Sequence, residues 1–158
     1  MLIERALPGD AEALSEIAML SKGHWGYPQR WMELWRVSLT VDPRTIRENP
    51  VYILEEGGDP AGFYVLLGKP PELDLDQLWV LPRWIGHGFG GELVRHALRL
   101  AAEMGAQLVT VQAEPHAENF YLHMGARRVG AFEYELEGLP RILPRLVFDL
   151  VQPETGSR

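Results

Sequence analysis

The chain has 158 residues, a formal net charge of -7 and no cysteine. This length is enough for one domain with its own core, and the absence of cysteine excludes disulfides, thiolate nucleophiles and thiolate metal sites. An acidic chain without a run of lysine or arginine argues against a nucleic-acid partner. The first residues lack the pattern of a signal peptide, and the longest apolar stretch, AGFYVLLG, is too short to cross a bilayer. We therefore expect a cytoplasmic protein without a membrane partner.

The first part of the chain predicts a strand, two helices and a hairpin. Residues 2–7 are expected to form a strand, and a helix starting near Pro8 and Asp10 follows. Its buried face is predicted to carry Ala11, Leu14, Ile17, Ala18 and Ser21. After the break GHWGYP, a second helix is predicted with Trp31, Leu34, Trp35 and Leu39 at helical spacing. Residues 41–50 predict a turn and a short helical piece, and residues 51–56 and 61–67 a hairpin.

The second part of the chain predicts strands that alternate with helices. A strand over 72–81 leads into a glycine cluster and a long helix, from about residue 88 to 104, that Gly105 caps. The remaining segments are predicted as a strand (106–113), a short helix (116–125), a strand (127–136), a loop (137–145) and a last strand (145–151). This order predicts one mixed α/β domain over residues 1–151, with residues 152–158 as a C-terminal tail.

Four glycines fall within six residues between a predicted strand and a predicted helix, in WVLPRWIGHGFGGELVRHAL. The first N–H groups of a helix lack helical partners, so a glycine turn that opens a helix is a site for an anion such as phosphate. A plain turn is the alternative, although one glycine would suffice for it. A Walker A loop is excluded because Gly90-Gly91-Glu92 places a carboxylate where that loop needs lysine.

A dinucleotide-binding turn is a second alternative. Gly86, Gly88 and Gly91 satisfy G-x-G-x-x-G, and Glu114 follows the next strand, where a ribose-binding acid would lie. However, Pro82–Ile85 separates the turn from its strand, and only about 40 residues follow Glu114, too few for the remaining parallel strands.

Two segments together resemble the GNAT N-acetyltransferases. LWVLPRWIGHGFGGELVRHAL is similar to motif A of that family, a strand ending in V-x-P before an R/Q-x-x-G-x-G/A turn, and EPHAENFYLHMGARRVG is similar to motif B. Three positions depart from the family pattern. Ile85 stands at the R/Q position, His116 replaces an asparagine for which Asn119 could substitute, and Ala126 replaces an aromatic residue.

The resemblance implies an α/β (mixed α+β) fold with a central, mostly antiparallel sheet of splayed strands flanked by helices. It also implies acetyl-coenzyme A (acetyl-CoA) as the acyl donor, and no metal. The backbone of the strand end and of the turn would hold the coenzyme, together with residues of motif B. The implied cofactor-binding residues are Leu78, Trp79, Val80, Leu81, Ile85, Gly86, His87, Gly88, Phe89, Gly90, Gly91, His116, Asn119 and Tyr121.

Acetyl transfer from a thioester needs a neutral amine, donors for the developing oxyanion and a proton for the departing thiolate. The resemblance gives the second task to an N–H near Val80 and the third to Tyr121, four residues before Gly125. A core tyrosine beside Phe120 is the alternative reading of Tyr121. The general base stays open among a water chain and Asp74, Asp76, Glu114, Glu133 and His24.

The strand before the turn changes its alternation. Leu73 and Leu75 are in one phase and Leu78 and Val80 in the other, which predicts a bulge near Asp76–Gln77. A central strand that is apolar on both faces near its end is the alternative.

The acceptor side is marked by an aromatic loop. His24, Trp25 and Tyr27 lie between the first two helices and are predicted to line the acceptor channel, whereas Trp31 and Trp35 predict helix packing. Arg141, in the predicted loop 137–145, could meet a carboxylate of the acceptor. The five histidines contain neither an H-x-H nor an H-E-x-x-H pair, so no metal site is predicted.

The predicted function is acetyl transfer from acetyl-CoA to a primary amine of a small molecule or peptide, by direct attack. The predicted partners are acetyl-CoA and the amine, and the chain is expected to be a monomer or a homodimer. A non-catalytic coenzyme A-binding domain is the main alternative, since Ile85, His116 and Ala126 depart from the family. A nucleotide-binding oxidoreductase is a third.

Overall fold

The computed structural model describes residues 1–150, so Val151 and the predicted tail over residues 152–158 lie outside the described residues. The described strands are hydrogen-bonded in the order β1-β2-β3-β4-β5-β7-β6. The chain divides into two compact units. Unit 1 contains residues 1–67 and 76–96, and unit 2 contains residues 68–75 and the described residues from 97 onward.

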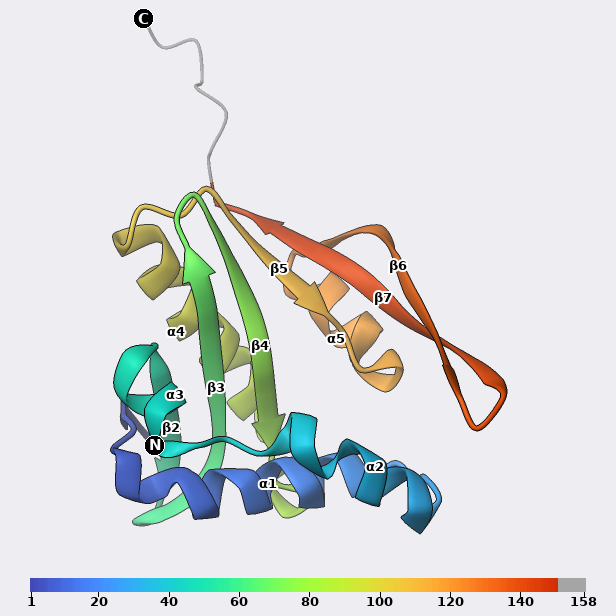
Figure 1. Cartoon of the computed structure of the whole chain (residues 1–158). Helices are drawn as coiled ribbons and strands as arrows, with labels where there is room; N and C mark the ends of the chain where they lie inside the picture. Colours follow the sequence, from blue (N-terminus) through green and yellow to red (C-terminus); the bar gives the residue numbers. More distant parts are fainter. Residues whose placement is uncertain (151–158) are drawn as a thin grey trace, which may run out of the picture. The chain divides into compact units, whose positions relative to one another are not determined.

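The elements of Figure 1 follow the predicted order closely. The strands are β1 (Leu2–Arg5), β2 (Val51–Glu56), β3 (Asp59–Lys69), β4 (Glu72–Val80), β5 (Leu108–Gln112), β6 (Arg127–Leu136) and β7 (Leu139–Asp149). The α-helices are α1 (Ala11–Gly23), α2 (Gln29–Leu39), α3 (Pro43–Glu48), α4 (Phe89–Glu103) and α5 (Glu118–His123). Short 3-10 turns are η1 (Pro8–Asp10), η2 (Pro82–Trp84) and η3 (Pro115–Ala117).

In unit 1, β1, β2 and β3 form an antiparallel ladder. One face of this ladder packs on α1, whose buried residues are the five that the sequence predicted: Ala11, Leu14, Ile17, Ala18 and Ser21. Apolar residues of α2 and α3 and of strands β2 and β3, Phe63 and Val65 among them, complete this core. The 3.6-residue period of α1 therefore positions the helix as predicted.

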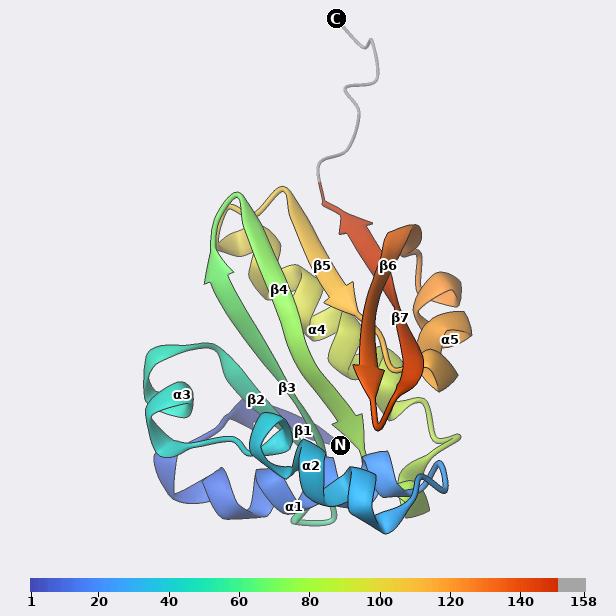
Figure 2. The same cartoon turned by 45° about the vertical axis from the view of Figure 1, so that its right-hand side comes forward.

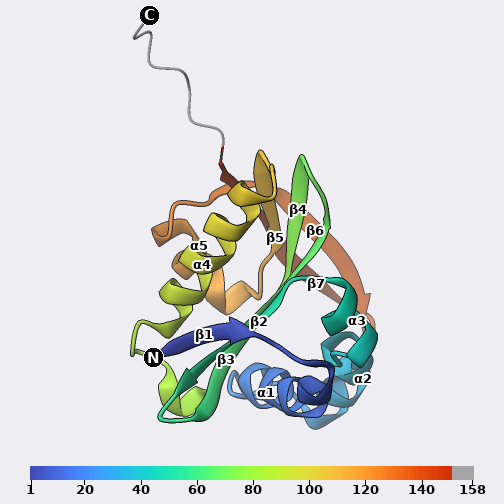
Figure 3. The ribbon, with the colours of Figure 1, turned by 90° about the vertical axis from the view of Figure 1, so that its left-hand side faces the viewer.

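The other face of β3 packs on the first half of α4. Successive strand residues point to opposite faces, so Gly62 and Tyr64 face away from Phe63 and Val65. The Tyr64 hydroxyl lies 2.7 Å from Nδ1 of His96 on α4. Figure 3 shows β1–β3 between α4 on one side and α1 and α3 on the other.

In unit 2, Glu72–Asp74 of β4 pairs in parallel with Leu108–Thr110 of β5. Strand β5 pairs with β7, and β7 with β6, both antiparallel. Helix α5 lies against β7, where the Tyr121 and Phe148 rings are 6.3 Å apart (Figure 2).

The loop predicted over residues 137–145 is wrong, because β7 already begins at Leu139. The connection is only Glu137–Gly138, with φ angles of 53° and 77°, as in a type I′ hairpin turn. Leu136 pairs with Leu139 beside this turn, which makes Glu135–Pro140 and Ala131–Pro144 non-hydrogen-bonded pairs. The prolines therefore interrupt no bond between β6 and β7.

A smaller prediction, the buried face of α2, is also corrected. On α2 the buried residues are Met32 and Leu39, whereas Leu34 is 58% exposed. Along β4, burial alternates through Leu73, Leu75 and Gln77, and the next three residues are all half-buried, so the bulge near Asp76–Gln77 stays a prediction. In the part of the chain that the structure describes, no helix is long and apolar enough to span a membrane.

Candidate functional site

The glycine turn in unit 1 connects β4 to α4 through η2. The chain turns by way of Trp84 N–H to Leu81 O (2.8 Å) and His87 N–H to Trp84 O (3.3 Å). The Gly88 carbonyl accepts the first helical bond from Glu92 N–H (3.2 Å), which makes Gly88 the N-cap of α4. The N–H groups of Phe89, Gly90 and Gly91 in the first turn are therefore the groups without helical partners.

Glycine is required in this turn by the backbone itself. Gly86 and Gly88 have φ angles of 89° and 81°, in the left-handed region that other residues rarely adopt. A Cβ atom at either position would meet nothing within 4 Å, so open space lies beside the backbone. The turn is anchored by Phe89, which is 8% exposed and whose ring lies 5.5 Å from that of Trp84.

These groups fit an anionic ligand such as a phosphate. Unpaired N–H groups at the positive end of a helix dipole attract anions. Trp84 Nε1 is a buried donor beside the turn, and no described residue accepts its hydrogen bond. Glu92, the one acidic residue in the first turn of α4, lies 2.7 Å from Arg95, which offsets its charge. His87 and Ile85 are exposed, and His87 Nδ1 lies 3.2 Å from Trp84 O.

The last residues of β4 are held by neighbours within unit 1. Ser21 Oγ on α1 donates to the Val80 carbonyl (2.9 Å), and Leu81 N–H donates to the Ala61 carbonyl (2.8 Å). Gly62 lies so close that a Cβ atom there would be 2.6 Å from the Trp79 carbonyl oxygen. The helical spacing predicts a buried Ser21, but no pattern in the sequence assigns Ser21 or Gly62 a role at this strand end. A glycine within an apolar strand was the available signal.

Tyr121 belongs to unit 2, where α5 buries its side chain to 5% exposure. Its ring lies 5.1 Å from Phe120 and 6.3 Å from Phe148. Burial raises the pKa of the Tyr121 hydroxyl above its usual value. An ordinary tyrosine, with a pKa of about 10, is already protonated at neutral pH, and burial strengthens this preference.

His116 and Asn119, also in unit 2, differ in surroundings. His116 Nδ1 lies 2.7 Å from a carboxylate oxygen of Glu114, and the Glu114 side chain is 8% exposed. Asn119 is exposed on α5. One ring nitrogen of His116 is therefore engaged by Glu114.

The aromatic residues between α1 and α2 make ring contacts with one another and with α2. The His24 and Trp25 rings are 5.0 Å apart. Tyr27 contacts the two tryptophans of α2, with 6.2 Å between the Tyr27 and Trp31 rings and 4.8 Å between the Tyr27 and Trp35 rings. The Lys22 ammonium lies 4.2 Å from the Trp35 ring centre and 5.2 Å from that of Tyr27, a cation–π arrangement that the sequence analysis did not find.

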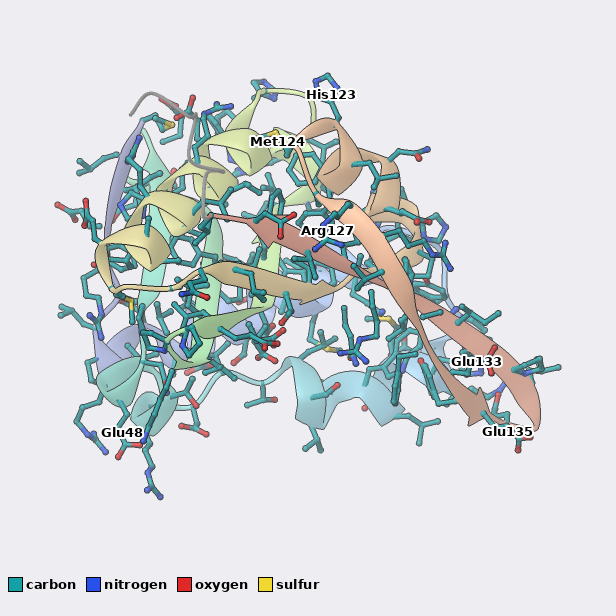
Figure 4. The ribbon with its side chains drawn as sticks, turned by 90° about the horizontal axis from the view of Figure 1, so that it is seen from above. Glu48, His123, Met124, Arg127, Glu133 and Glu135 are labelled. Atoms are coloured by element: carbon teal, nitrogen blue, oxygen red, sulfur yellow. The ribbon has the colours of Figure 1, made fainter. Side chains whose placement is uncertain are left out.

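The candidate bases and Arg141 have the following surroundings. Asp74 accepts a hydrogen bond from Thr110 Oγ1 (2.8 Å), and burial raises the pKa of its carboxyl. Glu133 is exposed on β6, and Figure 4 shows it with Glu135 toward the end of the β6–β7 hairpin, away from Arg127. Arg141 lies on β7 opposite Tyr134, instead of in a loop. Within residues 1–150, no three histidine or carboxylate side chains gather as metal ligands.

Comparison with known proteins gives both a relative and a family. YjaB of Salmonella typhimurium, named a peptidyl-lysine N-acetyltransferase, is 31% identical over 102 residues, which are 64% of this chain and 66% of that protein. The chain thus covers slightly less than two thirds of that relative's length. Residues 12–126 match the acetyltransferase (GNAT) family, a range that contains the turn, His116 and Tyr121.

Solved structures share the fold. A GCN5-related N-acetyltransferase from Rhodopseudomonas palustris superposes with a TM-score of 0.79 at 24% identity, covering 94% of this chain and 95% of that chain. The PaiA N-acetyltransferase from Thermoplasma acidophilum, in complex with coenzyme A, gives a TM-score of 0.75 at 15% identity, covering 94% and 98%. The predicted fold class, a mostly antiparallel sheet flanked by helices, is confirmed. By its matched residues and its fold, the chain belongs to the acetyltransferase (GNAT) family.

Proposed function

We propose that this protein transfers the acetyl group of acetyl-CoA to a primary amine. The observation that carries the proposal is the glycine turn at the start of α4, with its open backbone at Gly86 and Gly88, in a chain of the acetyltransferase family. Backbone N–H groups of Phe89, Gly90 and Gly91 would bind the pyrophosphate, and Trp84 Nε1 is a further donor beside it.

The acyl end of the coenzyme is assigned to the end of β4. Backbone groups of Leu78–Leu81 would hold the pantetheine arm in the manner of an added strand. In this arrangement the Val80 N–H donates to the thioester oxygen as negative charge develops on it. The acceptor nitrogen forms a bond to the acetyl carbon, and the bond from that carbon to sulfur breaks.

The departing thiolate needs a proton, and we assign this proton to Tyr121. Its hydroxyl is protonated at neutral pH even at the ordinary tyrosine pKa of about 10, and burial raises this pKa further. Donation to sulfur produces the free thiol of coenzyme A, and the acceptor loses one proton to a base. We do not assign this base to one group: a water chain and the five candidate side chains all stay open.

The acceptor is assigned to the aromatic loop. His24, Trp25 and Tyr27 would form one wall, and Arg141 would meet a carboxylate of the acceptor. The Salmonella relative is named for peptidyl-lysine, so a lysine side chain in a peptide is the first acceptor to test, followed by small amines.

A thiol-release assay with acetyl-CoA over a panel of lysine peptides, amino acids and polyamines tests this function. We expect release that depends on at least one amine, and calorimetric binding of coenzyme A but not of NAD. Binding of coenzyme A without release on any amine would support the non-catalytic domain, to which Ile85, His116 and Ala126 give weight. NAD binding without acetyl-CoA binding would contradict the proposal.

A further inference from the structure

Strand β3 and the end of β4 approach each other unusually closely at Gly62. A Cβ atom on this residue would lie 2.6 Å from the Trp79 carbonyl oxygen, 3.2 Å from Leu93 Cδ1 and 3.3 Å from Val80 Cα. The first distance is shorter than real Cβ contacts, and the opposing atom belongs to the backbone, which cannot swing aside as a side chain does. Gly62 is also not a turn glycine, since its φ lies outside the left-handed region. The residue is therefore needed for close approach.

The carbonyl that occupies this space belongs to the peptide group between Trp79 and Val80. A trans peptide group is planar, and its N–H points opposite to its C=O. With the Trp79 carbonyl against Gly62, the Val80 N–H must point away from Gly62. The conformation of this one peptide group thus sets the direction of the Val80 N–H. In the proposed function, this N–H donates to the thioester oxygen.

The next peptide group is fixed at both ends. Its carbonyl, on Val80, accepts a hydrogen bond from Ser21 Oγ at 2.9 Å, and its N–H, on Leu81, donates to Ala61 O at 2.8 Å. Ser21 is only 5% exposed, so water does not readily replace its hydroxyl. These two hydrogen bonds hold the Val80–Leu81 peptide group in place. They therefore also restrict rotation of the preceding Trp79–Val80 peptide group.

We infer that Gly62 and Ser21 are positioning residues for acetyl transfer, which aim the Val80 N–H at the thioester oxygen without contacting the coenzyme. This inference rests on the proposed function, because it takes the role of the Val80 N–H from it. A Cβ at position 62 displaces the Trp79 carbonyl and turns the Val80 N–H away from its target. Loss of the Ser21 hydroxyl releases the next peptide group.

Gly62→Ala is the main test, with Gly130→Ala as its matched control. Gly130 also lies within a strand, and a Cβ there meets nothing within 4 Å. Misplacement of a reacting contact by about 1 Å costs on the order of 100-fold in rate. We expect Gly62→Ala to lower kcat by about that factor while the coenzyme A dissociation constant stays nearly unchanged. Gly130→Ala should keep kcat near the wild-type value.

Ser21→Ala is the second variant, because Gly62→Ala could fail to fold. We expect about a tenfold fall in kcat with unchanged coenzyme A affinity, consistent with a moved rather than a lost oxyanion donor. Ser38→Ala is its control, since the Ser38 hydroxyl also bonds a carbonyl, that of Trp35, but on the exposed side of α2. All assays are run below the melting temperature of each variant, so that a loss of stability alone does not lower kcat.

A readout without turnover separates this inference from the proposed activity. An analogue of acetyl-CoA with a ketone in place of the thioester keeps the carbonyl, and its binding should shift the Val80 amide proton downfield in an NMR spectrum. Gly62→Ala should abolish this shift, and Gly130→Ala should keep it. A wild-type shift without turnover on any amine would leave the positioning role intact and contradict the acetyl transfer. An absent wild-type shift, or variants with wild-type kcat and shift, would overturn the inference.

Discussion

Among single residues, Tyr121 combines deep burial with an assigned chemical task. Its side chain is 5% exposed, and burial raises the pKa of its hydroxyl. A proton donor to a thiolate must hold its proton at the working pH. We expect Tyr121→Phe to lower kcat by about 100-fold or more, the range of general acid catalysis, with little change in coenzyme affinity. Thiol release and calorimetry measure the two quantities.

A tyrosine with only a packing role gives a different result. In that case Tyr121→Phe would change stability by roughly 1 kcal/mol and leave turnover intact. Tyr134→Phe is the matched control, because Tyr134 lies on β6 with its ring 5.9 Å from Phe132 and has no assigned role. Wild-type turnover in a folded Tyr121→Phe variant would remove the acid assignment.

The same residue predicts how stability depends on alkaline pH. The folded state holds the Tyr121 proton to a higher pH than the unfolded chain, whose tyrosines titrate near about 10. The folded state then binds more protons above that pH, so stability falls as pH rises. Between pH 9 and 11 the melting temperature of the wild type should fall more steeply than that of Tyr121→Phe. Parallel curves for the two proteins would contradict this.

Some single-residue features could be predicted from the sequence, and others could not. The glycine turn could be predicted because its four glycines lie within six consecutive residues, between a strand pattern and a helix pattern. Ser21 and Val80 are 59 positions apart, so their hydrogen bond needed the fold. The Glu114 contact that engages one nitrogen of His116 depends on side-chain orientation, which the sequence pattern does not contain.

Among the elements, the turn before α4 allows the effect of a substitution on stability to be separated from its effect on coenzyme A binding. Valine at Gly88 is strained because φ is +81°, and its side chain would fill the open space beside the backbone. Gly58, in the β2–β3 turn, has a φ of +86° and similar open space. Gly88→Val and Gly58→Val should each lose about 1–3 kcal/mol of stability. Calorimetry should find weaker coenzyme A binding only for Gly88→Val, and equal affinities would show that the glycines form a plain turn.

The parallel pairing of β4 and β5 predicts a substitution that stabilises the protein. Burial is the main cause that raises the pKa of Asp74, opposed by its hydrogen bond from Thr110. The folded state therefore binds more protons than the unfolded chain from about pH 4, the usual aspartate range, up to the raised pKa. Stability falls as pH rises through this window, so ionised Asp74 is unfavourable at pH 7.

Asp74→Asn keeps an acceptor for Thr110 and removes the buried charge. We expect a higher melting temperature than wild type at pH 7, and a difference that shrinks as pH falls toward 3, where Asp74 is protonated in both states. Asp59→Asn, at an exposed position, is the control. A melting temperature at pH 7 that is equal to or below the wild-type value would contradict the prediction.

The elements differed in how well sequence alone predicted them. The five buried positions of α1 follow one helical stripe, and they were predicted without error. On α2, the predicted packing of Trp35 agrees with the structure, since Trp35 and Tyr27 pack against the core, but Met32 is buried there and Leu34 is exposed. In β7, Pro140 and Pro144 suggested a loop, because proline cannot donate a hydrogen bond between strands. A strand accepts proline where its residue pair carries no hydrogen bond, and the sequence does not show which pairs these are.

For the whole molecule, the order of the predicted strands and helices, together with the two motifs, indicated the family before the fold was known. Strand β4 and helix α4 each have residues in both units, so the two elements that flank the glycine turn also join the units along the chain. A ligand bound at this turn should therefore stabilise a large part of the chain. The rise in melting temperature on adding the ligand then measures its binding to the folded protein.

A ligand that binds only the folded state raises the free energy of unfolding by RT ln(1 + [L]/Kd), about 2.7 kcal/mol at 100 times Kd. For a chain of this size we expect coenzyme A at that concentration to raise the melting temperature by about 5–10 °C. NAD should give no rise, because Pro82–Ile85 separates the turn from its strand, unlike a dinucleotide site. Gly88→Val should lose the rise at the same coenzyme concentration, and Gly58→Val should keep it. A rise with NAD but not with coenzyme A would refute the assigned ligand, since both contain a pyrophosphate and only coenzyme A has the pantetheine arm that is assigned to the end of β4.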